Sequence, residues 1–150
     1  MLPFQYCNPT KIIFGKGQIA RLPKEIPAGS RVLMTYGGGS IKNNGVYNQC
    51  LEALKGYECY EFGGIEPNPD YDTLIQAVDI IKAKNIDYLL AVGGGSVIDG
   101  TKFIAAAATC EGNPWDLIVN REPIKTALPL GAVLTLPATG SEMNGGTVIS

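Results

Sequence analysis

The sequence has no histidine, few cysteines, no excess of basic residues and no long apolar run. Its four cysteines, Cys7, Cys50, Cys59 and Cys110, are isolated, and none forms a Cys-x-x-Cys pair. Zinc sites in proteins are built mainly from such pairs and from histidines. We therefore expect no metal site in this chain, and we interpret the cysteines as free thiols in a reducing compartment.

Charge and hydropathy argue against two further classes of protein. The formal net charge of −2 and the pI near 5.1 provide no positive field for nucleic acid or an anionic membrane. The longest apolar segment, Phe103–Ala108, is far shorter than the roughly 20 residues that a membrane-spanning helix needs. Met1–Thr10 has no lysine or arginine ahead of an apolar stretch, so we expect no signal peptide and a cytoplasmic protein.

Short β-branched segments alternate with longer segments of helical spacing along the 150 residues, a length that fits one domain. The predicted strands are Lys11–Phe14, Arg31–Tyr36, Tyr57–Phe62, Tyr88–Val92 and Ala132–Leu136. The predicted helices are Gln18–Ile26, Val46–Lys55, Tyr71–Lys84 and Val97–Thr109. The last helix is apolar almost all round, so we expect protein to cover it on both sides. The alternation predicts an α/β fold, a Rossmann-like parallel sheet flanked by helices.

Two predicted strands end in the same tetrapeptide, Gly-Gly-Gly-Ser, at Gly37–Ser40 and at Gly93–Ser96. Open α/β sheets bind ligands at the carboxyl ends of their strands. Glycine lets backbone N–H groups approach a phosphate, and a helix that follows adds its positive end. Neither run is a G-x-G-x-x-G fingerprint or a P-loop, so an ordinary Rossmann dehydrogenase and a P-loop nucleotidase are not favoured. Together the runs predict a pyrophosphate cradle.

Other polar residues lie near these strand ends. Ser96 and Asp99 have the spacing of a capping box, which is compatible with a role for Asp99 near a ribose or nicotinamide. We interpret Lys102 as a solvated or packing lysine. Thr135–Glu142 offers three hydroxyls that can bind phosphate or ribose, or that form a Ser/Thr turn with a structural proline. We interpret Glu66–Pro69 mainly as a rigid turn, with ligand binding as the second interpretation.

Taken in order, these loops closely resemble the amino-terminal domain of the iron-containing (group III) alcohol dehydrogenases. Within that family they look like the branch of NADPH-dependent aldehyde reductases and butanol dehydrogenases. The matching segments are Pro9–Gly17, Tyr36–Ser40, Phe62–Pro69, Ala91–Lys102 and Thr135–Glu142. The resemblance implies that residues 1–150 are a dehydroquinate synthase-like dinucleotide-binding domain and that the family's helical, metal-binding carboxyl-terminal domain is absent. Thr147–Ser150 looks like a strand being entered, which also favours a fragment.

The resemblance implies cofactor contacts at twelve positions, which are Gly37, Gly38, Ser40, Asn68, Gly94, Gly95, Ser96, Asp99, Thr135, Thr139, Ser141 and Asn144. Gly94–Ser96 would hold the pyrophosphate, and Gly37–Ser40 would surround the adenosine ribose. NAD-preferring relatives tend to place an aspartate in this first loop, where it binds the 2′-hydroxyl and repels a 2′-phosphate. Here the loop has glycine and serine with Lys42 nearby, which favours NADP(H). Gly39→Asp is accordingly expected to shift the preference toward NAD.

The resemblance also implies an activity, the interconversion of aldehydes and primary alcohols by hydride transfer with NADP(H). The family's Fe²⁺ or Zn²⁺ is held by one aspartate and three histidines of the absent domain. We therefore expect no catalytic residue and no metal ligand in this chain, an inactive isolated chain, a small aldehyde or alcohol substrate, and a homodimeric parent enzyme.

Two alternatives remain open. A non-catalytic α/β module that binds a nucleotide or a phosphate-bearing metabolite would have the same glycine loops and need no histidine. Kinship with glycerol dehydrogenase or dehydroquinate synthase fits the architecture, but it fits Leu136–Glu142 less well.

Overall fold

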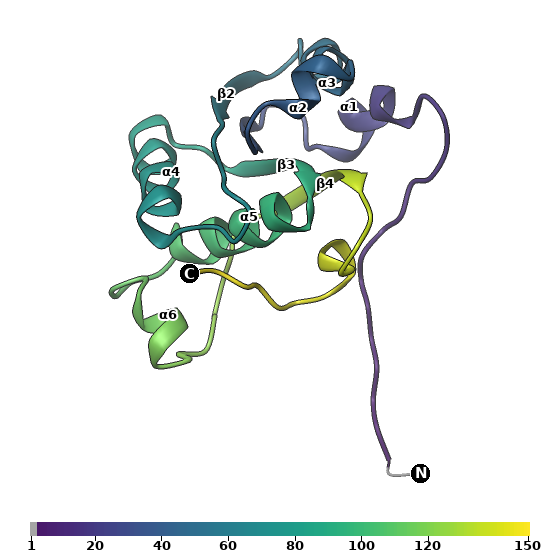
Figure 1. Ribbon diagram of the computed structural model, residues 1–150. Helices are drawn as coiled ribbons and strands as arrows, with labels where there is room; N and C mark the ends of the chain where they lie inside the picture. Colours follow the sequence, from purple (N-terminus) through teal and green to yellow (C-terminus); the bar gives the residue numbers. More distant parts are fainter. Residues whose placement is uncertain (1–2) are drawn as a thin grey trace.

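A sheet of four parallel strands forms the centre of the computed structural model, which describes residues 3–150 (Figure 1). The strands are β1 (Arg31–Tyr36), β2 (Glu58–Phe62), β3 (Tyr88–Gly94) and β4 (Leu130–Leu136), and they lie in the order β2-β1-β3-β4. Each neighbouring pair is parallel. The predicted α/β fold with a Rossmann-like parallel sheet is confirmed. Met1 and Leu2, which begin the stretch used for the signal-peptide prediction, lie outside the described residues.

Helices cover both faces of the sheet. They are η1 (Gln18–Arg21), α1 (Leu22–Glu25), α2 (Ser40–Asn43), α3 (Val46–Ala53), α4 (Tyr71–Lys84), α5 (Gly95–Ala107), α6 (Asp116–Val119) and η2 (Ser141–Met143). The first four pack on one face of β1 and β3, whereas α4 and α5 pack on the other. Within residues 3–150, no helix is both long enough and apolar enough to cross a membrane.

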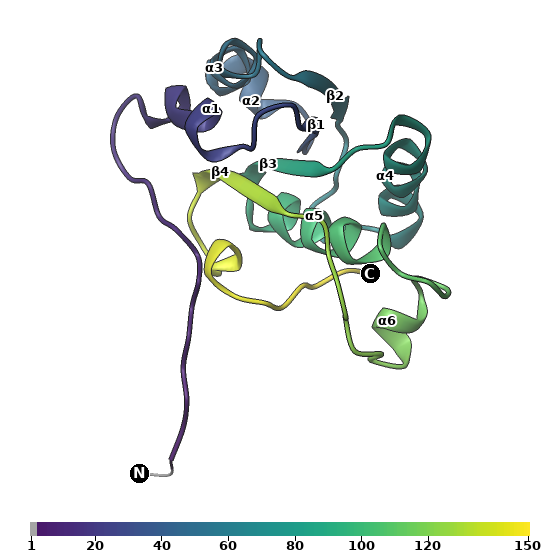
Figure 2. The ribbon, with the colours of Figure 1, turned by 180° about the vertical axis from the view of Figure 1, so that it is seen from behind.

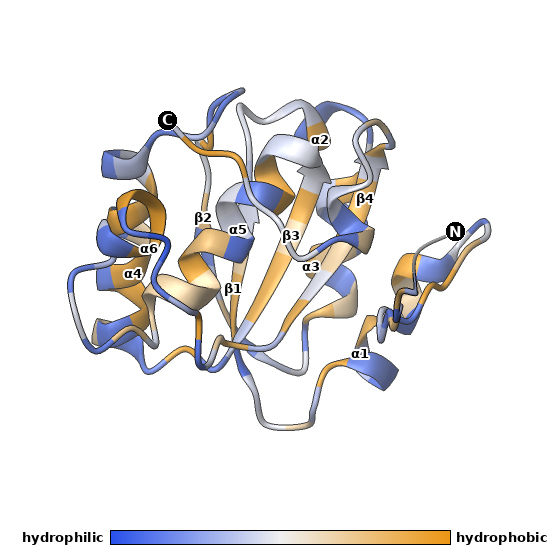
Figure 3. Cartoon of the chain, turned by 90° about the horizontal axis from the view of Figure 1, so that it is seen from below, coloured by the Kyte–Doolittle hydropathy of each residue, from blue (hydrophilic) through white to orange (hydrophobic). Residues whose placement is uncertain are grey.

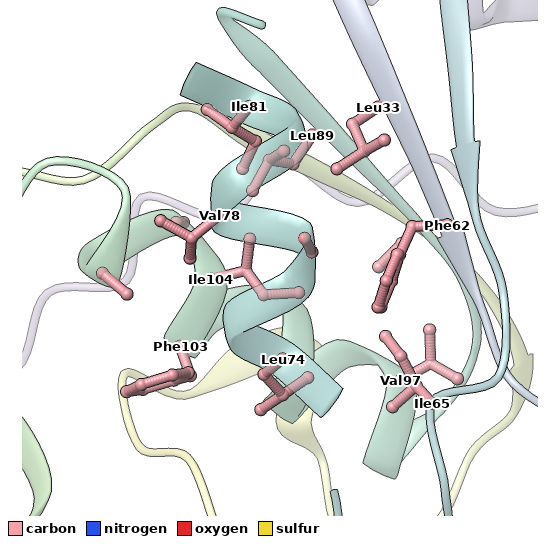
Figure 4. Packing of buried hydrophobic residues seen from close by; sticks show 14 of the residues in the cluster. Leu33, Phe62, Ile65, Leu74, Val78, Ile81, Leu89, Val97, Phe103 and Ile104 are labelled. Carbon is pink, nitrogen blue, oxygen red and sulfur yellow. The ribbon is translucent and has the colours of Figure 1, made fainter. Parts of the chain in front are cut away.

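The two central strands are apolar on both sides, which is why two layers of helices form (Figure 3). Along β1, Val32 and Met34 face α1 to α3, while Leu33 faces α4 and α5. Figure 4 shows Leu33 and Leu89 of the sheet beside the side chains of α4 and α5. Because side chains alternate along each strand, they pack into two separate hydrophobic cores, one on each face of the sheet.

Helix α4 has the bounds that the sequence predicts, because its end signals are local. The Asp70 side chain caps it by accepting hydrogen bonds from the backbone N–H groups of Asp72 and Thr73. At the other end, Asn85 adopts a left-handed conformation with φ of 51°. Helix α5 begins two residues earlier than predicted and buries nine of its residues, so the expectation that protein covers it is confirmed.

Two segments that the sequence predicts as strands do not form strands in the structure of residues 3–150. Lys11–Phe14 has no regular structure, and Ile12 and Phe14 are 65% and 97% exposed. This segment belongs to an extended arm that leaves the sheet (Figure 2). Thr147–Ser150 is not a strand either, although the backbone of Ser150 exchanges hydrogen bonds with Pro69 and Tyr71. Strand propensity reflects fit to a neighbouring pleated surface, and neither segment lies beside another strand.

Candidate functional site

A cleft of about 870 Å³ lies over the carboxyl ends of β1 and β3. After β1 the chain passes to α2 and α3 on one face of the sheet, and after β3 it passes to α5 on the opposite face. The two connections diverge, which leaves a crevice between them. Open α/β sheets bind ligands at such a switch point, and the volume falls within the usual range for small-molecule sites.

Ten of the twelve predicted site residues line this cleft, namely Gly37, Gly38, Asn68, Gly94, Gly95, Ser96, Asp99, Thr139, Ser141 and Asn144. The other two do not. Ser40 is the exposed first residue of α2, and Thr135 lies within β4, ahead of the loop that reaches the cleft. The fold thus gathers residues that follow all four strands onto one edge of the sheet. The first glycine loop follows β1, Asn68 lies after β2, and the second glycine loop ends β3. The third loop, residues 137–146, bears the hydroxyls and follows β4.

The glycines of these loops permit close backbone contacts. A Cβ added to Gly95 would lie 3.1 Å from Thr139 Oγ1 and 3.3 Å from Ser141 Oγ, which is tighter than ordinary packing. A Cβ on Gly93 would lie 2.7 Å from Cγ2 of Val97, so that glycine lets α5 start directly against the strand end. Gly93 therefore serves the packing of α5, while Gly95 keeps the cleft open beside the third loop.

The capping box predicted at Ser96 and Asp99 is wrong. Because α5 already begins at Gly95, Ser96 lies inside the helix, and no side chain of residues 3–150 caps the first turn. Asp99 instead lies with its Oδ1 3.2 Å from the ammonium of Lys102. Among the described residues, the N–H groups of the first turn of α5 thus have no side-chain acceptor at the edge of the cleft.

Lys102 is an organising residue of the third loop; of its two interpretations, the solvated lysine is wrong and the packing lysine is confirmed. Its ammonium donates hydrogen bonds to the carbonyl oxygens of Ser141 at 2.9 Å and Asn144 at 3.3 Å, and also to that of Gly146. The side chain of Lys102 is only 15% exposed. Sequence reasoning missed it because its partners lie about 40 residues away and leave no local signal.

Lys42 does not lie among the residues that line the cleft. Its ammonium sits 5.1 Å from the ring centroid of Tyr36 and 5.0 Å from that of Tyr47. Both tyrosine hydroxyls donate to the carboxylate of Glu61. The hydrogen bond from Tyr47 to Glu61 raises the pKa of Tyr47 to about 12. The ammonium of Lys42 therefore makes cation–π contacts with two tyrosine rings beside the first loop.

Metal-binding side chains do not cluster in the part of the chain that the structure describes. Residues 3–150 contain no group of three or more histidine, cysteine, aspartate or glutamate side chains placed to hold an ion. What the cleft offers is hydroxyls, amides and unpaired backbone N–H groups, which suit phosphate and ribose oxygens.

The family model described as iron-containing alcohol dehydrogenase matches residues 9–150. The chain is 58% identical to the NADPH-dependent aldehyde reductase YqhD of Escherichia coli K12, over 98% of this chain and 39% of that protein. It is 55% identical to the probable NADH-dependent butanol dehydrogenase 1 of Bacillus subtilis, over 100% of this chain and 40% of that protein.

Solved structures of such dehydrogenases and reductases also match the chain. The crystal structure of Escherichia coli YqhD matches with a TM-score of 0.95 at 57% identity, covering 99% of this chain and 39% of that one. The NADH-dependent butanol dehydrogenase A of Thermotoga maritima matches with a TM-score of 0.94 at 48% identity, covering 99% and 38%. The chain thus spans about two fifths of the length of these relatives.

Proposed function

Because the chain belongs to the iron-containing alcohol dehydrogenase family, we propose that its cleft binds a nicotinamide dinucleotide. The observation that carries this proposal is the meeting of two glycine loops and a hydroxyl-bearing loop at the switch point of the sheet. The pyrophosphate would lie against the first turn of α5, where the N–H groups lack side-chain acceptors. The hydroxyls of Ser96, Thr139 and Ser141 would donate to its oxygens.

We propose the remaining contacts from the position of each residue along the cleft. Gly37 and Gly38 follow β1, so their backbone would meet the adenosine half of the dinucleotide. Asp99 and Asn144 lie further along α5 and the third loop, so they would meet the nicotinamide half. When bound, the dinucleotide supplies or accepts the hydride. This chain's own residues bind it and orient it, and Ser40 and Thr135, which do not line the cleft, remain predicted contacts.

For the whole protein we propose the interconversion of small aldehydes and primary alcohols. The support is the two curated relatives, one named as an NADPH-dependent aldehyde reductase and one as a probable NADH-dependent butanol dehydrogenase. Residues 1–150 would be the dinucleotide-binding domain. The Fe²⁺ or Zn²⁺ expected for the family does not fit residues 3–150, so its site is proposed for a helical domain outside them. Cytoplasmic location and a homodimeric parent stay predictions.

Titration of the chain with NADPH and NADH tests the cofactor proposal. We expect NADPH to bind with the higher affinity, measured by calorimetry on protein shown to be folded by circular dichroism. AMP and inorganic pyrophosphate serve as comparison ligands, because a non-catalytic phosphate-binding module would take them without any preference for nicotinamide. A folded chain that binds neither dinucleotide would contradict the proposal.

The first glycine loop provides a second test, at Gly38 rather than Gly39. Gly39 has φ of 100°, so an aspartate there would strain the backbone. Gly38 lines the cleft, and a Cβ added to it meets no atom within 4 Å. Gly38→Asp should lower the ratio of NADPH to NADH affinity about tenfold, because a carboxylate repels the 2′-phosphate and accepts a hydrogen bond from the 2′-hydroxyl. Gly38→Asn is the uncharged control of matched size, and equal ratios in both variants would count against the assignment.

A further inference from the structure

One side chain, Lys102, holds together the loop that forms the far wall of the cleft. Its ammonium lies within hydrogen-bonding distance of the carbonyl oxygens of Ser141, Asn144 and Gly146, and of Asn144 Oδ1 at 3.0 Å. Asp99 Oδ1 lies 3.2 Å away on its other side. An ammonium has three donors and no acceptor, so these oxygens share all of its hydrogen-bonding capacity.

The loop has little structure of its own to replace these contacts. Between Ser141 and Gly146, the backbone hydrogen bond outside regular elements is that from Met143 N–H to the Gly140 carbonyl. The Asn144 side chain adds two contacts, to the Gly140 carbonyl and from the Gly146 N–H. From outside the loop, Asn8 donates a hydrogen bond to the Met143 carbonyl at 2.9 Å, and just after the loop Thr147 donates to the Asp99 carbonyl. Three carbonyls that would otherwise repel one another converge on the ammonium of Lys102, which makes more contacts with the loop than either of these side chains.

The same cation balances the charge of Asp99, a residue of the cleft wall. Both side chains are 15% exposed, so solvent screens the pair only partly. Without the ammonium, the carboxylate would present a negative charge to an anionic ligand. Lys102 therefore has two separable effects, one on the position of the loop and one on the charge of the cleft.

We propose that Lys102 is a positioning residue for the nicotinamide half of the dinucleotide. It acts by fixing Ser141–Gly146 against α5, so that Ser141 and Asn144 line the cleft beside Asp99. This inference rests on the proposed cofactor function. The adenosine half would depend on Gly37 and Gly38 instead, which Lys102 does not contact.

Lys102→Met tests the proposal, since methionine keeps most of the length of the side chain and removes its charge and donors. NADPH affinity should fall about tenfold, whereas affinity for adenosine 2′,5′-bisphosphate, which has no nicotinamide half, should stay within about twofold. Hydrogen exchange at the amides of Met143 and Gly146 should accelerate, while the amides of β3 keep their protection. Lys82→Met, at an exposed lysine of α4, is the matched control.

A second variant separates the two effects of the lysine. If Lys102 acted only by balancing Asp99, the methionine substitution would lose its effect in an Asp99→Asn background. We expect the loss of about tenfold to persist there, because the three loop carbonyls still lack their donor.

The outcomes are distinguishable. Equal losses for NADPH and the bisphosphate, unchanged exchange of the loop amides, or full suppression by Asp99→Asn would each overturn the positioning role. Failure of the unsubstituted chain to bind either ligand would overturn the proposed cofactor function, and this inference with it.

Discussion

Gly95→Val should weaken NADPH binding by this chain about hundredfold. Even a single added Cβ at Gly95 would lie 3.1 Å from Thr139 Oγ1 and 3.3 Å from Ser141 Oγ. Valine adds two further methyl groups at the point where α5 begins and where the pyrophosphate is proposed to lie. The hydroxyls would have to move away from the cleft, and the first-turn N–H groups would be shielded from phosphate oxygens.

Side chains of increasing size at position 95 test this expectation. Gly95→Ala should cost less than valine, because the hydroxyls need to give by only a few tenths of an ångström. Gly112→Val is the control, since Gly112 is exposed and a Cβ there meets nothing within 4 Å. Calorimetric titration with NADPH gives the affinities, and circular dichroism checks the fold. Binding of NADPH by a folded valine variant as tightly as by the unsubstituted chain would remove Gly95 from the proposed site.

Features of the fold that local chemistry determines were predictable from the sequence. Helix α4 has an aspartate at its amino-terminal cap and an asparagine in a left-handed conformation at its end, and its predicted bounds are confirmed. The same holds for β1, whose apolar run is bounded by turn residues on both sides. The glycine loops were found because a glycine run after a strand has a local physical meaning.

Features that depend on distant partners were not predictable in this way. Lys11–Phe14 has the composition of a strand, yet no strand lies beside it in residues 3–150. Ser96 has the spacing of a cap, but α5 starts one residue before it because Gly93 lets Val97 pack against the strand end. The partners of Lys102 belong to a loop that only the tertiary fold brings near.

A pair of buried threonines links the helix of the cleft to the central strands. Thr35 of β1 and Thr101 of α5 are both fully buried, and their Oγ1 atoms lie 2.6 Å apart. Thr101 donates to the carbonyl oxygen of Val97, so the hydroxyl proton between the two threonines comes from Thr35. The other acceptor near Thr35 Oγ1 is the Leu90 carbonyl, at a longer 3.4 Å. The pair thus fixes α5, which lines the cleft, against β1, whose end carries the first glycine loop.

Thr101→Ala should lower the free energy of unfolding by about 2 kcal/mol, because it leaves the Thr35 hydroxyl buried with only a long contact and opens a small cavity. Urea unfolding with an unchanged m-value measures this loss. Thr35→Ala removes the donor itself, so the double variant should cost about 1 kcal/mol less than the sum of the two single variants. The cycle cancels the helix propensity gained at position 101 and the strand propensity lost at position 35. Additive losses would show that packing alone, and not the hydrogen bond, holds α5 on the sheet at this point.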